Sequence, residues 1–466
     1  MSDASTRTRR KRRQGILHLG MGQGSTDDVT AWAGLTLVLE TMRALRLEEV
    51  AEKHLPTGRR QRGFSPGEKL ESLVLLLAAG GERVEDVRRL AEDRGLERLL
   101  ETRFPSPDTL LDFLGLFHDE ALVAARPPGK KAFVPQESEA LKGLAAINTA
   151  LVARGASATA TTATIDADGT IIEAHKREAT VAYEGTRGYQ PLVAVWAEEA
   201  LVVADEFRDG NVAGGEDPLS CAKRAFESLP PQVKQRYYRG DSASYYLPLL
   251  KYLVGAVDGF SISADMTKEL RVACQALPEA AWTSLEERTT EAVHVAEVEF
   301  TPGDWPKTAA PLRYVSMRFT PNQGTFFEER GPKLLAVVTN RRELSAAELV
   351  KWHWGKAGTI EHVHRALKDE LGAGVMPSGR FGVNAAWFRI NALTLNVLTV
   401  LKRRALPESL RNARPRRLRF ECFTAPAKLT LHQSQLTALM GVSPERLAML
   451  VAARGRLLDM LEAASP

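Results

Sequence analysis

The spacing of apolar and polar positions changes near residue 160 and again near residue 290. From residue 25 to residue 155, apolar residues recur at helical spacing, as in LEEVAEKHL (47–55) and VEDVRRLAEDRGLERLL (84–100), so this stretch is predicted to be helical. Ser65-Pro66-Gly67-Glu68 has the spacing of a capping box with proline at the first helical position. Ser106-Pro107 opens a further predicted helix in the same way.

Short apolar runs separated by glycines replace this pattern after residue 160 and predict a mixed α/β region. The predicted strands are TATIDADGTII, LVAVWAEE, LVVADEFRDG and GFSISAD, and the predicted helices are SCAKRAFESL and the second half of YYRGDSASYYLPLLKYL. Between residues 291 and 340 three runs alternate apolar and polar residues, which predicts an antiparallel β insertion. Residues 345–372 are predicted to be helical, and residues 384–406 to form a long, mostly buried helix with Trp387 and Phe388 in the core.

Composition adds that the chain is globular and that its positive charge is unevenly placed. Of its 466 residues, 44% are hydrophobic and 26% charged, which excludes wholesale disorder, and the net charge is only +4. Yet RTRRKRR (7–13) carries six basic side chains, and residues 402–419 carry eight against one acid, Glu408. Two such blocks favour a polyanionic partner, nucleic acid above all.

The cysteines and the apolar runs indicate the cellular compartment that is expected for this protein. Cys221, Cys274 and Cys422 lie far apart and form no CxxC pair, so we expect reduced thiols in a cytoplasmic protein rather than disulfides or structural zinc. The N-terminal basic stretch has no apolar run behind it, and no run of 18 apolar residues occurs anywhere. Neither a secretory signal nor a membrane partner is therefore expected.

Asp166 and Asp168 lie inside the first predicted strand of the α/β region, between isoleucines. Because side chains along a strand alternate between its faces, both carboxylates point the same way. A carboxylate in an apolar setting is costly unless it is paired or binds a metal. One interpretation is a haloacid-dehalogenase-type phosphatase, whose DxDGT loop resembles Asp166–Thr170, with Asp166 as nucleophile and Asp168 as acid and base. The second acid of that family's magnesium motif is absent, since Tyr245 follows Asp241 by four residues.

A second interpretation uses three acids from different elements. Asp168 is followed by Gly-Thr on the first strand, Asp241 follows another strand end in RGDSASY, and Glu361 lies on a late predicted helix, in TIEHVHRALKDE. Carboxylates from two strands and a helix can hold two divalent metal ions about 3.5–4 Å apart, which is the arrangement used in phosphoryl transfer. Magnesium prefers such hard oxygen ligands. We expect Asp168 to be the metal ligand and Asp166 to support it or to hold a cation, although the residues alone leave the reverse open.

These blocks resemble the DDE transposases of bacterial insertion sequences, specifically the insertion-sequence 1380 family, over roughly residues 60–440. FPSPDTLLDFL (104–114) resembles the family's N-terminal helix, and PAKL (426–429) resembles a C-terminal motif. DADGTII, RGYQPLVAV and RDGN resemble the first-acid block, and RGDSASYYLPLL resembles the second. The third block resembles the signature Y-x2-R-x3-E-x6-K, of which Glu361 and Lys368 match the last two positions.

Two positions of that signature differ in this chain. Trp354 stands where tyrosine is usual and Ala357 where arginine is usual, which puts one DNA-backbone contact in doubt, although neighbouring Lys356 can replace it. Trp354 can still stack on an unpaired base. Glu361 and Lys368 are seven residues apart, which places them on one helical face, with Arg365 nearby to grip phosphate. The basic arm adds DNA contacts through Arg9, Arg10, Lys11, Arg12 and Arg13.

The resemblance implies an RNase H-like α/β core in two parts, residues 156–285 and 343–405, around the β insertion at 286–342. A flexible basic arm (1–24) and a helical DNA-binding domain (25–155) would precede it, and a basic helical C-terminal region (406–466) would follow. The resemblance implies that Asp168, Asp241 and Glu361 catalyse the reaction with two Mg²⁺ ions, which Mn²⁺ can replace. The DNA substrates would be terminal inverted repeats and target DNA. The protein would act as a homodimer in the bacterial cytoplasm. The phosphatase, an RNase H-like nuclease without strand transfer and a silent DNA-binding protein remain the alternatives.

Overall fold

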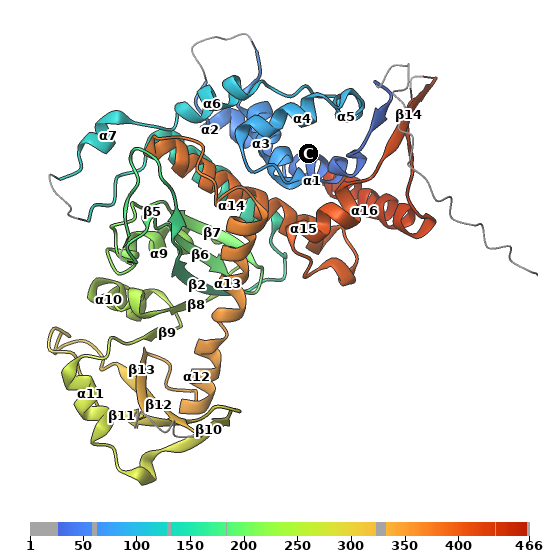
Figure 1. The fold of residues 1–466 in the computed structure, drawn as a ribbon. Helices are drawn as coiled ribbons and strands as arrows, with labels where there is room; N and C mark the ends of the chain where they lie inside the picture. Colours follow the sequence, from blue (N-terminus) through green and yellow to red (C-terminus); the bar gives the residue numbers. More distant parts are fainter. Residues whose placement is uncertain are drawn as a thin grey trace, which may run out of the picture.

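The computed structural model describes residues 27–57, 63–127, 132–182, 184–322, 332–433 and 435–463. A mixed sheet lies at its centre, with the strand order β10-β11-β12-β13-β9-β8-β2-β6-β7, and helices flank it (Figure 1). The five strands of the α/β region are β2 (Thr162–Gly169), β6 (Leu192–Trp196), β7 (Leu201–Glu206), β8 (Gln235–Gly240) and β9 (Gly259–Ser263). The sequence pattern had predicted strands at the places of β2, β6, β7 and β9 and a strand end before Asp241, where β8 ends, and all of these are confirmed.

The directions of these strands divide the sheet at β2. On one side β2 pairs antiparallel with β6, and β6 with β7; on the other side β2, β8 and β9 run parallel. Helices α9 (Pro218–Glu227) and α10 (Leu247–Ala256) provide the crossovers between parallel strands. A small sheet of β3 (Ile172–Glu173), β4 (Thr180–Val181) and β5 (Arg187–Tyr189) lies between β2 and β6 in the chain. Parallel strands end at the same edge of a sheet, so residues that follow β2 and β8 come together there.

The predicted β insertion is present and extends the central sheet. Strands β10 (Thr283–Glu287), β11 (Glu291–Val298), β12 (Arg313–Pro321) and β13 (Lys333–Thr339) pair antiparallel in chain order, after helix α11 (Lys268–Gln275). β13 then pairs with β9, where Val338 lies opposite Ile262. Val295, Val315 and Val337 pack with Leu349 and Val350 of helix α12 (Ala346–Trp354) in a cluster of their own. The insertion therefore carries its own core and also fixes α12 against the sheet.

The long buried helix predicted near residue 384 is α14 (Phe381–Arg404), and Trp387 and Phe388 are fully buried in it, as predicted. Its polar residues hold the edge of the sheet. The Asn396 side chain accepts a hydrogen bond from the Val202 amide (2.8 Å) and donates one to the Val202 carbonyl oxygen (2.7 Å). Because β7 is the last strand on this side, these bonds satisfy backbone groups that no further strand could pair.

The N-terminal region is helical, as predicted. Its helices are α1 (Thr36–Ala44), α2 (Leu47–His54), α3 (Pro66–Ala79), α4 (Val87–Ala91), α5 (Arg94–Leu100), α6 (Pro107–Gly115), α7 (Glu120–Ala124) and α8 (Glu139–Gly155). The capping box is confirmed, since the Glu68 amide donates to Ser65 Oγ (3.2 Å) and the Ser65 amide donates to Glu68 Oε2 (2.7 Å). The stretch 84–100 is divided, because Asp93 caps a new helix through the Leu96 amide (2.8 Å).

The C-terminal region differs from the helical prediction between residues 427 and 440. Strands β14 (Ala427–His432) and β15 (Gln435–Met440) form a hairpin there, followed by α16 (Pro444–Ala463). Exposure alternates from residue to residue along β15 and along the first half of β14, which is a strand period. β14 pairs with β1 (Val29–Thr30), so the two ends of the described chain share a sheet. The N-terminal helices and the C-terminal region therefore form one structural unit.

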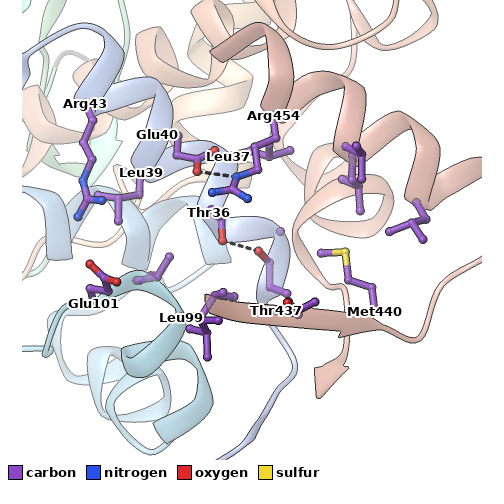
Figure 2. A pocket seen from close by; sticks show the side chains of 18 of the residues that line it. Thr36, Leu37, Leu39, Glu40, Arg43, Leu99, Glu101, Thr437, Met440 and Arg454 are labelled. Atoms are coloured by element: carbon purple, nitrogen blue, oxygen red, sulfur yellow. Dashed lines mark hydrogen bonds and ion pairs between the residues drawn. The ribbon is translucent and has the colours of Figure 1, made fainter. Parts of the chain in front are cut away.

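A hollow of about 650 Å³ lies where these two ends meet, between α1, α16 and β15 (Figure 2). Its charged groups bind one another across the gap: Arg454 Nε lies 2.7 Å from Glu40 Oε1. Leu37 and Leu39 contribute apolar surface from α1. The Arg454–Glu40 ion pair therefore links α1 to α16 across this hollow.

Two predictions from composition can be compared with the described residues. Cys221, Cys274 and Cys422 are buried and free of disulfides, as predicted. In the described part of the chain, every helix is too short or too polar to cross a bilayer.

Glu71 on α3 supplies a test of the helical core. It is 7% exposed, and its Oε1 has no hydrogen-bond partner among the described residues. Burial raises the pKa of Glu71 to about 7, and the charge of Glu48 adds to this rise. The native state therefore binds a proton more tightly than the unfolded chain, so stability should fall as pH rises from about 4.5 to about 7. We expect Glu71→Gln to be more stable than wild type by about 1–3 kcal/mol at pH 8 and similar at pH 4.5, measured by urea unfolding. An equal effect at both pH values would contradict this account.

Candidate active site

The first two acids meet because their strands are parallel neighbours. Asp168 lies near the end of β2 and Asp241 directly follows β8, and Ala167 is in register with Gly240. Asp168 Oδ1 accepts a hydrogen bond from the Gly169 amide (3.0 Å), and its side chain is 26% exposed. The charge of Asp168 and a hydrogen bond between the Asp168 and Asp241 side chains both raise the pKa of Asp241, so the two carboxylates interact directly. The sequence prediction that these two residues form one site is consistent with this geometry.

The third acid enters from a helix that crosses the same edge. Helix α13 (Ala357–Arg365) follows α12 after a short turn and carries Glu361, which is exposed. Asp168, Asp241 and Glu361 line one cavity of about 480 Å³, together with Trp354 and Lys356. Five of the residues that the sequence singled out are thus brought together, from two strands and the α12–α13 turn.

Lys356 is the cation of this cavity that pairs with Asp168. Its Nζ lies 3.5 Å from Asp168 Oδ2, and the residue is only 9% exposed. Burial raises the pKa of Asp241, Lys356 opposes that rise, and the negative charge of Asp168 adds to it. Two carboxylates in contact repel each other, so a positive charge must lie nearby. The Lys356 ammonium, which the sequence offered as a substitute contact to the DNA backbone, is directed toward Asp168.

Asp166 has a separate role, two residues before Asp168. It is fully buried, and Arg239 grips it with two bonds, Nε to Oδ1 at 2.7 Å and Nη2 to Oδ2 at 2.8 Å. The two residues are directly opposite one another in the β2–β8 register. Burial raises the pKa of Asp166, and Arg239 acts against that rise. Asp166 thus holds a cation, as one of the sequence interpretations expected, and that cation is a guanidinium.

This ion pair also fixes the helices that carry the rest of the site. Arg239 Nη1 donates to the carbonyl oxygen of Trp352 (2.7 Å), and its guanidinium lies 5.5 Å from the centre of the Trp352 ring. Thr359 at the start of α13 also bonds to Asp166. Asp166 therefore positions the α12–α13 turn, and with it Lys356 and Glu361, over the strand ends.

The burial of Asp166 contradicts the phosphatase interpretation. A nucleophilic aspartate must reach its phosphate ester, whereas both oxygens of Asp166 are bound by Arg239 inside the protein. The partly exposed carboxylate in this motif is that of Asp168.

Lys368 and Arg365 lie farther along the same helical stretch. A π-helical segment, Ala366–Glu370, follows α13 and interrupts the α-helical spacing on which a shared face with Glu361 was predicted. The Lys368 ammonium donates to the Ile171 carbonyl oxygen (2.8 Å) and lines a neighbouring hollow with Thr170 and Gln190. Arg365 is exposed at the end of α13. Arg9, Arg10, Lys11, Arg12 and Arg13 lie outside the described residues.

Several residues of the site had no signal in the sequence. Arg288 and Phe319 reach the cavity from the β insertion, and the Arg288 guanidinium lies 4.8 Å from the centre of the Trp354 ring. Asp265 follows β9, the next parallel strand; burial raises its pKa, and the charge of Asp241 adds to the rise. The residues of the insertion are distant in sequence from all three acids, so only the folded sheet reveals them.

His353 is a packing residue beside the cavity. It is buried between Ser261 and Ser263, whose hydroxyls lie 2.8 Å from Nδ1 and 3.0 Å from Nε2. Burial lowers the pKa of His353 to about 4, and Lys356 and Arg239 act in the same direction. The imidazole is therefore neutral at pH 7 and adds no charge to the cavity.

The carboxylates are suited to a hard divalent cation. Asp168 and Asp241 are in mutual contact, Glu361 lines the same cavity, and carboxylate oxygens are preferred ligands of Mg²⁺. Among the described residues, no three Asp, Glu, His or Cys side chains already form a metal-binding cluster.

Comparison with known proteins gives the family of this chain. The family model described as "Transposase DDE domain group 1" matches residues 22–456, so the chain belongs to this family of DDE transposases. DDE transposases use divalent metal ions, typically Mg²⁺. No curated protein matches the chain in sequence. Among solved structures, it is similar to a piggyBac transposase in a synaptic complex with hairpin DNA, with a TM-score of 0.42 and 12% identity over 83% of this chain and 80% of that one.

Proposed function

We propose that this transposase cuts a phosphodiester at the ends of its own element to free a 3′-OH, and joins that hydroxyl to target DNA. The observation that carries the proposal is the convergence of Asp168, Asp241 and Glu361 on one cavity. Within the DDE transposases, the sequence blocks favour the insertion-sequence 1380 family and a bacterial source. The substrates would be the terminal inverted repeats and a target duplex, held by a homodimer.

The arrangement of the strands supports an RNase H-like core. Three antiparallel strands, β2, β6 and β7, lie on one side of the sheet, and the parallel strands β8 and β9 continue it. The first two acids follow the adjacent parallel strands and the third lies on a helix across their ends, which is the placement that the three-acid interpretation requires.

The residues of the cavity divide the chemistry between them. Asp168, Asp241 and Glu361 would hold two Mg²⁺ ions, which when bound activate the attacking oxygen and stabilise the leaving one. Mn²⁺ should substitute, because it accepts the same oxygen ligands. Trp354, Arg288 and Phe319 form a wall suited to the strand that is cut, since an aromatic ring stacks on bases and a guanidinium pairs with phosphate. No step calls for a serine or tyrosine nucleophile.

DNA binding would involve surfaces beyond the cavity. We propose that the helical N-terminal region and the basic arm read the inverted repeats, and that Lys368 and Arg365 contact phosphates near the cut. Lys368 is close to the Asp168 strand end through its bond to Ile171, which suits this role.

The test is a cleavage assay on duplex DNA that carries the element's two ends, taken from the sequence flanking the gene. With Mg²⁺ we expect a nick at each end that leaves a 3′-OH, followed by joining to a second duplex. Cutting without joining would favour the nuclease without strand transfer. Absence of any cutting, with binding retained, would favour the silent DNA-binding protein.

Lys356→Met tests how the acids are neutralised. The variant removes the cation 3.5 Å from Asp168 and leaves the repulsion between Asp168 and Asp241 unopposed. We expect it to lose about 1–3 kcal/mol of stability without divalent metal, between the values for exposed and buried ion pairs. Added Mg²⁺ should restore more of the melting temperature in this variant than in wild type. Equal Mg²⁺ shifts in the two proteins, measured by thermal melting, would contradict this role.

A further inference from the structure

A long groove lies on the other side of helix α13 from the acids. It has a volume of about 1010 Å³, and its walls are α13, the end of α14 and the segment from Arg411 to Phe420, which includes the short helix α15 (Pro415–Leu418). Glu361 lines the acid cavity, whereas its neighbours His362 and Val363 line this groove. A single helix therefore separates the acid cavity from the groove.

The charged side chains that line the groove are basic. Of the described residues, six basic side chains and no acidic ones line it: Lys402, Arg403, Arg411, Arg414, Arg416 and Arg417. Four of these cations are partly neutralised from outside the groove: Arg403 by Glu199 (2.8 Å), Arg411 by Glu408 (3.0 Å), Arg414 by Glu370 (3.0 Å) and Arg417 by Glu421 (3.9 Å). The Arg414 and Arg417 side chains are still 56% and 57% exposed. Such a row of accessible guanidinium groups suits a chain of phosphates.

Phe420 lies at the same groove and is 77% exposed, more than any other large hydrophobic residue of the described chain. Its backbone is firmly held. Arg446 donates to the carbonyl oxygens of Phe420 (3.0 Å), Glu421 (2.8 Å) and Thr424 (2.9 Å). Phe420 also belongs to a π-helical turn, Arg419–Phe423, a form often found at functional sites. The ring is thus presented to solvent by a fixed backbone.

We propose that this groove binds a DNA strand with unpaired bases, with phosphates on the arginines and one base stacked on Phe420. Cationic grooves with an exposed aromatic ring are the usual platform for single strands. The proposal rests on the proposed function for the choice of DNA, because cutting at an element end leaves a strand that can unpair beside α13.

The test measures binding of the full-length chain to labelled DNA by fluorescence anisotropy, without divalent metal so that no cutting occurs. The probes are a single-stranded oligonucleotide of mixed sequence, the same sequence as a duplex, and that duplex with an unpaired tail. The variants are Phe420→Ala, Phe420→Tyr, and the double variant Arg416→Ala, Arg417→Ala. Leu431→Ala, another exposed apolar residue, and Arg271→Ala, an exposed arginine on α11, are the matched controls.

Phe420→Ala should weaken binding to the single strand and the tailed duplex on the order of tenfold and leave the blunt duplex unchanged. Phe420→Tyr should bind like wild type, because its ring still stacks. The double arginine variant should reduce the slope of log affinity against log salt for the single strand by about 1.4. Both controls should bind like wild type.

Equal single-strand affinity for Phe420→Ala and Leu431→Ala would overturn the proposal, as would an unchanged salt slope in the double variant. These outcomes are independent of cleavage. A protein that binds single strands through Phe420 but never cuts element ends would contradict the proposed function alone. If the protein cuts the element ends but Phe420→Ala leaves its affinity for single-stranded DNA unchanged, only the proposal for the groove is contradicted.

Discussion

Glu361→Ala is expected to bind element-end DNA as wild type does and to cut it at least about 1,000-fold more slowly. Metal ions contribute several kcal/mol to phosphoryl transfer, and each 1.36 kcal/mol is a factor of about ten in rate. Removing the helix carboxylate would leave Asp168 and Asp241 without their third partner in the cavity. Because Glu361 is exposed on a helix, alanine should fold normally. Loss of activity would therefore report on chemistry rather than on folding.

The measurement compares initial rates of nicking by wild type, Glu361→Ala and a matched control, Asp459→Asn, which removes an exposed acid on α16. Binding is followed on the same DNA by gel shift, so a loss of binding cannot be mistaken for a loss of cutting. Wild-type nicking by Glu361→Ala would show that the third acid is not part of the catalytic site. Asp265, the acid that follows β9, would then be the next candidate for that place.

The sequence predicted those parts of the site that depend on local pattern. Strand periodicity placed Asp166 and Asp168 on one face of a strand, and a strand end was predicted directly before Asp241. The meeting of Asp168 and Asp241 then required only that β2 and β8 be parallel neighbours. The partner of Asp166 was beyond prediction, because it depends on the register that sets Arg239 opposite it. The register between two strands that are far apart in the sequence is set by side-chain packing on both faces of the sheet. The local pattern of either strand therefore does not predict it.

Long-range packing also accounts for the remaining differences. The ion pair between Lys356 and Asp168 depends on the turn between α12 and α13, which brings together residues that are far apart in the sequence. The π-helical segment after α13 separates Lys368 from the face of Glu361, and helical spacing alone assumes a regular helix. At 427–440, where a helical region was predicted, β14 and β15 pair with each other, and β14 also pairs with β1, some 400 residues earlier in the chain.

Asp166→Ala is expected to lose about 3–5 kcal/mol of stability, because it leaves the Arg239 guanidinium buried without its counterion. Total stabilities of about 5–15 kcal/mol are usual, so this loss is a large share. The matched control is Asp168→Ala, two residues along the same strand and partly exposed, which should lose less than about 1 kcal/mol while losing cleavage. Urea unfolding of both variants, followed by circular dichroism, measures the two effects.

A double variant, Asp166→Leu with Arg239→Met, separates charge from packing. If the cost of Asp166→Ala comes from an unpaired buried charge, removing both charges should recover most of it, since apolar residues of similar volume often replace buried ion pairs without loss. The double variant would still lack the Arg239 bond to the Trp352 carbonyl oxygen, so α12 and α13 should shift and cleavage should stay low. Recovered stability with low activity would show that the pair orients Glu361 and Lys356. Full cleavage activity in the double variant would instead show that the Asp166–Arg239 ion pair only stabilises the β2–β8 contact and does not orient the site.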